Sequence, residues 1–161
     1  MTLPVSHAQE SLKLTGDAYV DLYQIQLKNT STYVRFTARE DITWQGNLYS
    51  SIGCSMSGDQ LTAEGQEAKP SLTILNPAGI FNTFLQAGTL DLATVTRRRF
   101  LRNHVEANLT IYQQRMWYVS RIRDLISGQS FTIELRSMSE GPNFWIPARA
   151  YLPPEFPTVS F

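Results

Sequence analysis

Hydrophobic and polar positions alternate with a period of two in the first clearly patterned stretch of this chain. Within residues 18–27, Val20 and Leu22 fall on one face, and Tyr23 and Ile25 fall on the other. A period of two is that of a β-strand, whose successive side chains point to opposite faces of a sheet. We therefore expect a strand over residues 18–27 with apolar side chains on both faces.

Further segments with strand patterning follow, separated by residues that favour turns. Strands are expected at residues 33–37, 71–75, 92–102, 108–112, 116–126 and 131–135, and the run 42–49 is interpreted as two short strands around Gln45–Gly46–Asn47. Gly46 and Asn47 can both adopt positive φ, which a tight hairpin requires. The turn at residues 28–31 predicts a first hairpin, and Ser127–Gly128–Gln129 joins the last two strands into another. Residues 53–69 are polar, and we expect a weak strand and an exposed loop there.

Residues 116–126 show the clearest alternation in the chain. One face would carry Trp117, Val119, Arg121 and Arg123, and the other Tyr118, Ile122 and Leu125. This segment and the strand that follows it are the hairpin that the pattern predicts most strongly.

Two short helical patterns interrupt the strands. The first lies within residues 1–15, where Pro4 suits an early helical position and Gly16 ends the pattern. The second covers residues 80–85, where apolar residues recur at i, i+1, i+4 and i+5 before Gly88.

Residues 142–161 form a C-terminal arm rich in proline and aromatic residues. The aromatic positions are Phe144, Trp145, Tyr151, Phe156 and Phe161. Because proline restricts the unfolded chain, ordering such an arm costs less entropy than ordering an ordinary tail. An exposed aromatic arm would promote aggregation. We therefore expect it either to wrap its own domain or to dock on a neighbouring subunit, and both alternatives remain open.

Together these elements predict one mainly β domain over residues 1–161. The expected architecture is an antiparallel β-sandwich or barrel of eight to ten strands, with one or two short helices and the extended C-terminal arm. The first residues lack the charged and apolar segments of a signal peptide, so we expect no secretory leader.

The composition excludes several classes of protein. The chain has 161 residues, 14 Lys+Arg, 14 Asp+Glu, 42% hydrophobic residues and only 17% charged residues. This content is too apolar for a disordered chain, no run of 18 apolar residues predicts a transmembrane helix, and no basic excess favours nucleic-acid binding. The charges are unequally distributed, however. Residues 1–95 carry nine acids and five bases, a balance of −4, and residues 96–161 carry five acids and nine bases, a balance of +4.

Two interpretations of this asymmetry remain open. The two halves neutralise each other within the fold, or the acidic face of one subunit meets the basic face of the next. Arg97, Arg98 and Arg99 are the densest basic run. On a strand, Arg97 and Arg99 point one way and Arg98 the other. We expect a solvated strand or a salt-bridged subunit contact there rather than a nucleic-acid stripe.

The sequence offers little catalytic or metal-binding chemistry. Cys54 is the only cysteine, and His7 and His104 are the only histidines, so neither a disulfide framework nor a zinc site is expected. His7 lies in a terminus expected to be mobile, His104 lies in an expected turn, and Cys54 is interpreted as a buried or half-buried thiol. Neither common phosphate-binding glycine motif occurs. We expect no enzyme activity and no cofactor.

Four segments resemble a known family in their order and spacing. Residues 18–27 (AYVDLYQIQL) resemble the opening strand of the minor tail protein L family, which are tail-tip proteins of lambda-like long-tailed phages. Residues 42–49 (ITWQGNLY) are similar to the family's VTWQGxxY stretch, and residues 69–76 (KPSLTILN) to its RPTLTVSN. Residues 97–100 fall where the family has a VVRRKV strand. Residues 145–161 also resemble the aromatic–proline C-terminus of short phage tail proteins of the DUF1833 type.

The resemblance implies a structural role at the tip of a phage tail. Such proteins form a ring between the tail tube or distal tail ring and the central hub or fibre protein. Their domain is similar to the β-sandwich or barrel of tail tube and hub proteins. A ring of the chain's own copies is implied, with a trimer favoured over a hexamer. L-type proteins usually continue into a cysteine-rich domain that resembles an iron–sulfur or metal site. We expect this chain to lack that domain because Cys54 is its only cysteine.

We therefore expect a virion protein of a bacteriophage, made in the host bacterial cytoplasm and located at the tail tip. Its expected subunit interface comprises Arg97, Arg98, Arg99, Phe144, Trp145, Tyr151, Phe156 and Phe161. Neither nucleic-acid binding nor a membrane span is expected. The alternative is a β-barrel that binds a small molecule or carbohydrate, with Trp44, Trp117 and Trp145 as stacking surfaces.

Overall fold

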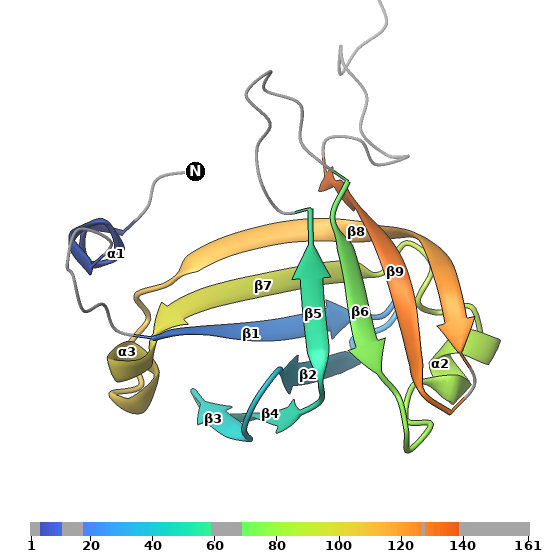
Figure 1. Ribbon diagram of the computed structural model, residues 1–161, viewed down its shortest axis with the longest axis horizontal. Coiled ribbons are helices and arrows are strands. Elements are labelled where there is room, and N and C mark those ends of the chain that lie inside the picture. The colour runs from blue at the N-terminus through green and yellow to red at the C-terminus, as the bar shows by residue number, and fades with distance from the viewer. Residues whose placement is uncertain (1–3, 11–17, 59–68, 127, 139–161) are drawn as a thin grey trace, which may run out of the picture.

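The computed structural model describes residues 4–10, 18–58, 69–126 and 128–138 of the chain, which form nine strands and three short helices (Figure 1). The strands are β1 (Tyr19–Gln26), β2 (Tyr33–Thr37), β3 (Ile42–Trp44), β4 (Asn47–Ser51), β5 (Cys54–Ser57), β6 (Ser71–Leu75), β7 (Thr94–Leu101), β8 (Gln113–Ile126) and β9 (Ser130–Ser137). The helices are α1 (Val5–Glu10), α2 (Asn82–Gln86) and α3 (Arg102–Glu106).

All nine strands belong to one sheet in the order β3-β4-β2-β1-β7-β8-β9-β6-β5. Neighbouring strands are antiparallel except β2 and β4, which are parallel. The predicted mainly β and mostly antiparallel class is therefore confirmed. Strands from the second half of the sequence lie between strands from the first half. The acidic and basic halves of the sequence are thus interleaved in the sheet.

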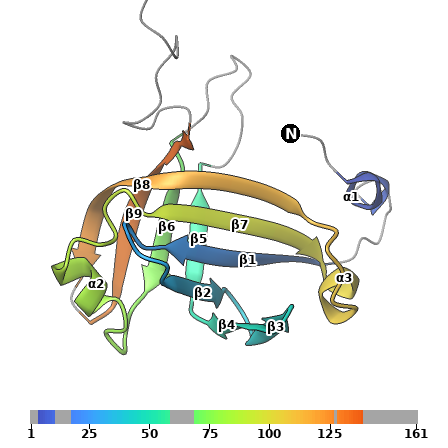
Figure 2. The same ribbon diagram turned by 180° about the vertical axis from the view of Figure 1, so that it is seen from behind.

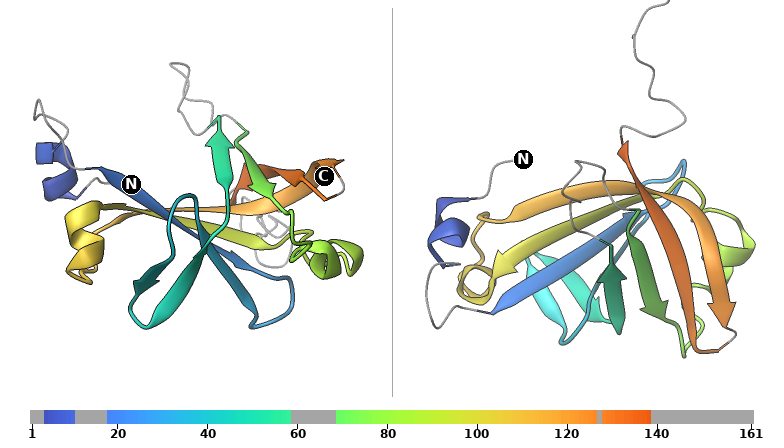
Figure 3. Two further views of the ribbon diagram at one scale, coloured as in Figure 1. Left: turned by 60° about the horizontal axis from the view of Figure 1, so that its bottom comes forward. Right: turned by 45° about the horizontal axis from the view of Figure 1, so that its top comes forward.

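Strand β8 bends the sheet around one face. Its first half pairs with β7 and its second half with β9, and the pairing with β9 shifts between Val119 and Arg121 and again between Ile122 and Asp124. Such bulges bend a strand and increase its twist. Figures 1 and 2 accordingly show β5, β6 and β9 crossing steeply over β1 and β7, and Figure 3 shows the same curl from two further directions.

Because of these bulges, residues 116–126 do not follow the strict alternation that the sequence predicts. That alternation puts Ile122 on the face opposite Val119. In the structure, Ile122 packs against the same core cluster that contains Val119. An extra residue in a bulged strand reverses which face the following side chains take, and a period-two pattern does not show where that residue falls.

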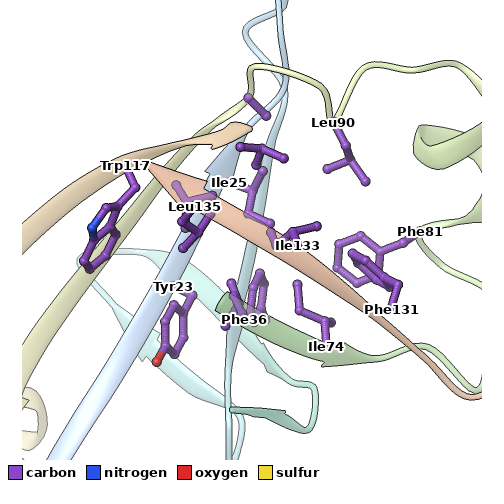
Figure 4. Close-up of a cluster of buried hydrophobic side chains, with 14 of the residues drawn as sticks. Tyr23, Ile25, Phe36, Ile74, Phe81, Leu90, Trp117, Phe131, Ile133 and Leu135 are labelled. Atoms are coloured by element: carbon purple, nitrogen blue, oxygen red, sulfur yellow. The ribbon is translucent and has the colours of Figure 1, made fainter. Parts of the chain in front are cut away.

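The main hydrophobic core fills the concave side of the curled sheet (Figure 4). Strands far apart in the sheet order contribute to it, including Ile25 of β1, Ile74 of β6 and Ile133 of β9, each 0% exposed. Phe36 stacks on Tyr23 with ring centroids 5.5 Å apart. Packing between strands that are distant in the sheet order therefore stabilises the curl.

Phe81 closes one end of this core. It precedes α2, is 0% exposed, and lies 5.1 Å from the ring centroid of Phe131 and 6.2 Å from that of Phe36. Its backbone N–H donates to the side-chain oxygen of Asn76, whose amide nitrogen in turn donates to Asn82. The expected short helix is therefore present, and it seats an aromatic side chain in the core.

A second cluster covers the opposite, convex face. The β3–β4 hairpin places Trp44 against Phe100 of β7 and Tyr112, with ring centroids 5.0 Å and 5.6 Å from the Trp44 ring. Leu22 of β1 is buried in the same cluster. As the pattern of residues 18–27 predicts, β1 therefore carries apolar side chains into both faces of the sheet.

Residues 108–112 correct another expectation, because they do not form the predicted strand. Asn108 has a positive φ of 53°, and its side-chain oxygen accepts the N–H of Gln45. The Leu109 carbonyl accepts the Trp44 indole N–H at 3.0 Å. The side chains of Trp44 and Asn108 thus form hydrogen bonds with backbone groups that could otherwise pair with a neighbouring strand.

Two local details also differ from expectation. The β3–β4 turn places positive φ at Gln45 and Gly46, rather than at Gly46 and Asn47. Residues 102–106, expected as part of a strand and a turn, form α3, which an ion pair of 3.1 Å between Arg102 and Glu106 supports at the i, i+4 spacing.

Candidate functional site

A groove of about 800 Å³ opens on the concave side of the sheet. The strand ends that line it lie away from α2 (Figure 1). Its walls are the first half of β1, residues 37–40 after β2, strand β5 and the neighbouring ends of β7 and β8. Arginine is its most frequent charged residue. The charged lining residues are Arg39, Arg97, Arg99, Arg102 and Arg115, with Asp21 and Glu40. Among the lining residues that the structure describes, five positive and two negative groups give a formal charge of +3, although the whole chain is neutral.

The three consecutive arginines alternate across the sheet as the sequence predicts. Arg97 and Arg99 line the concave groove. Arg98 points to the convex cluster, where its guanidinium donates to Gln114, Gln24 and Tyr49 at 3.3 Å in each case. One basic run therefore serves two different faces of the sheet.

The groove arginines are joined to acids from the other half of the sequence. Arg99 makes a two-point ion pair with Asp21 on β1, with both N···O distances 2.8 Å. Arg102 pairs with Glu40 at 2.7 Å. These contacts, together with the interleaved strands, support internal neutralisation. They do not support a separation into an acidic and a basic face.

Arg97 lies at the base of the groove and is only 3% exposed. Its guanidinium carbon is 5.5 Å from the ring centroid of Trp117, and Nη1 lies 3.4 Å from the sulfur of Met56 on β5. In the β7–β8 register, Arg97 is directly opposite Arg115. Like charges directly opposite one another destabilise a strand pair. Two arginines from neighbouring strands thus lie side by side at the base of the groove.

Neither the Cys54 thiol nor the Tyr23 hydroxyl in the groove is an activated nucleophile. Burial, and then the nearby Asp21 carboxylate, raises the pKa of the Cys54 thiol from 9.0 to about 11. Burial likewise raises the pKa of the Tyr23 hydroxyl, with Asp21 contributing in the same direction. Both groups hold their protons at neutral pH, whereas reactive cysteines have lowered pKa values. Among the described residues no group of three or more His, Cys, Asp or Glu side chains could hold a metal ion.

His7 is buried rather than mobile, which corrects the expectation from the sequence. It is 2% exposed, and its ring lies 5.8 Å from that of Tyr19 and 6.0 Å from that of His104. Burial lowers the pKa of His7, and the charges of His104 and Arg99 act in the same direction. Helix α1 therefore docks on the sheet through a side chain that is neutral when buried.

This geometry predicts a loss of stability in mild acid. The unfolded chain takes up a proton at His7 as the pH falls through about 6.5, whereas the folded chain resists protonation until a lower pH. The unfolded state then binds more protons, so the free energy of unfolding decreases as the pH falls below about 6.5. Replacing His7 with phenylalanine retains a ring but removes the titration. Thermal melts between pH 7.5 and 5.0 should show a weaker pH dependence for His7→Phe than for the wild type, and equal slopes would contradict the assignment.

The structure accounts for only part of the predicted interface set. Arg97, Arg98 and Arg99 lie in the sheet as described above. The aromatic residues Phe144, Trp145, Tyr151, Phe156 and Phe161 lie outside the described residues, so their interface role stays a prediction. Sequence reasoning missed the contribution of Arg39 and Arg115 to the groove. No sequence signal identifies them, because the strand order and the curl of the sheet together bring β8 and the end of β2 to the same groove.

Comparison with known proteins shows similarity at the level of structure rather than sequence. No protein-family model matches the chain, and no curated protein matches it significantly. A chain in a solved structure described as the virion of a native gene transfer agent particle is similar, with a TM-score of 0.64 and 15% sequence identity. The match covers 93% of this chain and 50% of that chain, so this chain spans about half the length of that neighbour. At this identity, the similarity shows a shared fold.

No helix of the described residues has the length and hydrophobicity needed to span a membrane.

Proposed function

We propose that this chain is a structural component of a phage-like virion. The observation that carries the proposal is the shared fold with a virion chain over 93% of the present sequence. More specifically, we propose a tail-tip or baseplate hub subunit that links the tail tube or distal tail ring to the central hub or fibre protein. The motifs at residues 18–27, 42–49 and 69–76, which resemble the minor tail protein L family, support this finer assignment.

In this proposal the subunits form a ring of identical copies, with a trimer favoured over a hexamer. A ring requires heterologous contacts, in which one surface of a subunit meets a different surface of the next. Arg97–Arg99 and the aromatic residues of the 142–161 arm remain the proposed contact residues. Because Arg97 is 3% exposed, Arg98 and Arg99 are the members of the run with more surface to offer a neighbour.

Exposed apolar side chains at the end of the sheet opposite the groove also support an assembly role. Leu75 of β6 and Ile126 of β8 flank Ser130 of β9 in the sheet register, and they are 50% and 53% exposed. Directly paired residues in neighbouring strands point to the same face. Large apolar side chains gathered on one face often mark a contact with another protein.

The direct test is to locate the chain in particles. Particles are purified from cells that express an epitope-tagged copy, and antibody–gold labelling is imaged by electron microscopy. The proposal predicts that the chain co-purifies with particles and that gold lies at one end of the tail. Labelling of the capsid would contradict the tail-tip assignment, and absence of the chain from purified particles would contradict the virion role.

The carbohydrate-binding alternative has less structural support. Trp44 and Trp117 are 5% and 6% exposed and pack in the convex and concave cores, so they do not present rings to a ligand. The third residue, Trp145, lies outside the described part of the chain.

A further inference from the structure

Strand β5 has an open edge that faces the arginine-lined groove. Within the described residues, β5 pairs only with β6, and it is the last strand in the sheet order. Cys54, Ser55, Met56, Ser57 and Gly58 form one wall of the groove. An open strand edge presents unpaired backbone N–H and C=O groups, which can pair with another extended chain.

Two hydrogen bonds show which backbone groups face the open side. The Leu75 N–H donates to the Gly53 carbonyl at 2.7 Å, on the β6 side, whereas the Ile52 N–H donates to the Thr37 carbonyl at 2.9 Å, on the opposite side. Backbone groups of an antiparallel strand alternate in direction. The N–H and C=O groups of Cys54 and Met56 therefore point to the same side as the Ile52 N–H, into the groove.

The open position beside β5 continues the line of β2. Thr37 is the last residue of β2 and accepts the Ile52 hydrogen bond, after which residues 38–40 turn away along the groove wall. An extended segment placed beside β5 would therefore continue in line with β2, and no described strand occupies this position. Below this position lie Arg97 and Arg115, and at its side lies the exposed Arg39.

We propose that this groove binds an extended acidic segment of a neighbouring polypeptide, which adds to β5 as a strand. Backbone hydrogen bonds to Cys54 and Met56 would align the segment. Alternate side chains of an added strand point to one face, so carboxylates at every second position would reach the half-buried Arg115 and the exposed Arg39, whereas Arg97 lies buried at the base of the groove. Arginine suits this contact because its planar guanidinium pairs with a carboxylate through two hydrogen bonds.

The edge favours a peptide over a nucleic acid. A peptide supplies both N–H donors and C=O acceptors in the alternation that β5 presents, whereas a phosphodiester backbone supplies acceptors alone. A different polypeptide is favoured over a second copy of this chain. Five of the described acids make ion pairs within their own subunit, namely Asp21, Glu40, Glu106, Asp124 and Glu134, and the remaining described acids do not lie on a strand, so none of them alternates along an extended segment. That the partner belongs to the same particle rests on the proposed function.

A model peptide tests the charge requirement with the full-length protein. The probe is a synthetic ten-residue peptide of alternating glutamate and valine, and its control has glutamine in place of glutamate. Isothermal titration calorimetry at low salt should show binding of the acidic peptide and at least tenfold weaker binding of the control. The double variant Arg39→Glu/Arg115→Glu should weaken binding of the acidic peptide by at least tenfold. Arg123→Glu, an exposed position outside the groove lining, should leave the affinity unchanged.

A second pair of variants tests the backbone contact. Met56→Pro removes an N–H that points into the groove without removing a hydrogen bond to β6, and edge strands tolerate proline at such positions. Met56→Leu keeps the N–H and a side chain of similar size. We expect Met56→Pro to weaken binding of the acidic peptide at least tenfold and Met56→Leu to retain it, with circular dichroism melts confirming that both are folded.

Several outcomes would overturn the inference. The wild type fails to bind the acidic peptide, or it binds the glutamine peptide equally well. Undiminished binding of the acidic peptide by folded Met56→Pro would also overturn the inference, because it would indicate a simple anion site. Self-association that the acidic peptide reverses would show that a second copy is the occupant, through acids such as Asp59, Glu64 and Glu67. A chain that enters particles but does not bind the peptide would refute only this inference, and peptide binding by a chain absent from particles would refute only the proposed function.

Discussion

Replacement of Phe81 by alanine is expected to lower the free energy of unfolding by about 3–5 kcal/mol. Phe81 is fully buried and lies against both Phe36 and Phe131, which come from strands distant in the sheet order. The truncation removes buried aromatic surface and leaves a cavity where the core is closed. Domains of this kind have total stabilities of about 5–15 kcal/mol, so the loss would be a large fraction of the whole.

The adjacent Ile80 provides a matched control. It is 56% exposed, and Ile80→Ala should change stability by less than about 1 kcal/mol. Urea unfolding monitored by circular dichroism at one fixed pH measures both variants. Similar small effects for the two substitutions would show that Phe81 does not close the core as described.

Deletion of residues 142–161 is expected to abolish ring assembly and leave a folded monomer. The described members of the two buried clusters lie between residues 20 and 135, so the deletion removes none of these. In our proposal the arm docks on a neighbouring subunit, and the deletion removes that contact. Multi-angle light scattering at high protein concentration should give the mass of an oligomer for the full chain and that of one subunit for the truncated chain.

A full-length control separates the aromatic contacts from the length of the arm. Phe144, Trp145, Tyr151, Phe156 and Phe161 are replaced together by serine, which should also prevent assembly while keeping every proline. The thermal midpoint distinguishes the two alternatives for the arm. A truncated chain that melts several degrees below the full chain at a concentration where both are monomeric would show that the arm wraps its own domain. Normal assembly of the truncated chain would contradict any role in docking.

Local sequence patterns predicted most of the strands because each depends on a few neighbouring residues. The strands at residues 33–37 and 71–75 coincide with β2 and β6, and the hairpin around Ser127–Gly128–Gln129 is the β8–β9 pair. Alternation along residues 18–27 also placed Leu22 and Ile25 on opposite faces of the sheet, where each enters a different core cluster.

Features that depend on contacts between distant segments were beyond the sequence pattern. The strand expected at residues 108–112 is replaced by irregular chain because Trp44, more than 60 positions earlier, takes the Leu109 carbonyl. The buried position of His7 likewise depends on Tyr19 and His104. The groove is the clearest case, since the strand order places Arg97 opposite Arg115, and the curl of the sheet brings Arg97 to Met56 of β5.

The structure also shows how the acidic and basic halves of this near-neutral chain are placed. The −4 and +4 halves of the sequence do not form two faces, because β1 lies beside β7 and Asp21 pairs with Arg99. The remaining unevenness is local, because the described residues that line the groove carry a formal charge of +3. Electrostatic attraction in the proposed assembly is therefore expected at that groove rather than between whole halves of the subunit.

Electron cryomicroscopy of the particle that contains this chain tests the central claim most directly. The proposal predicts density for the curled nine-stranded domain at the tail tip, repeated around the tail axis and joined to the tail tube or distal tail ring on one side. Three copies per ring are favoured, and six would still agree with a hub role. A fully interpreted tail tip without this domain, or the domain located in the capsid, would contradict the account.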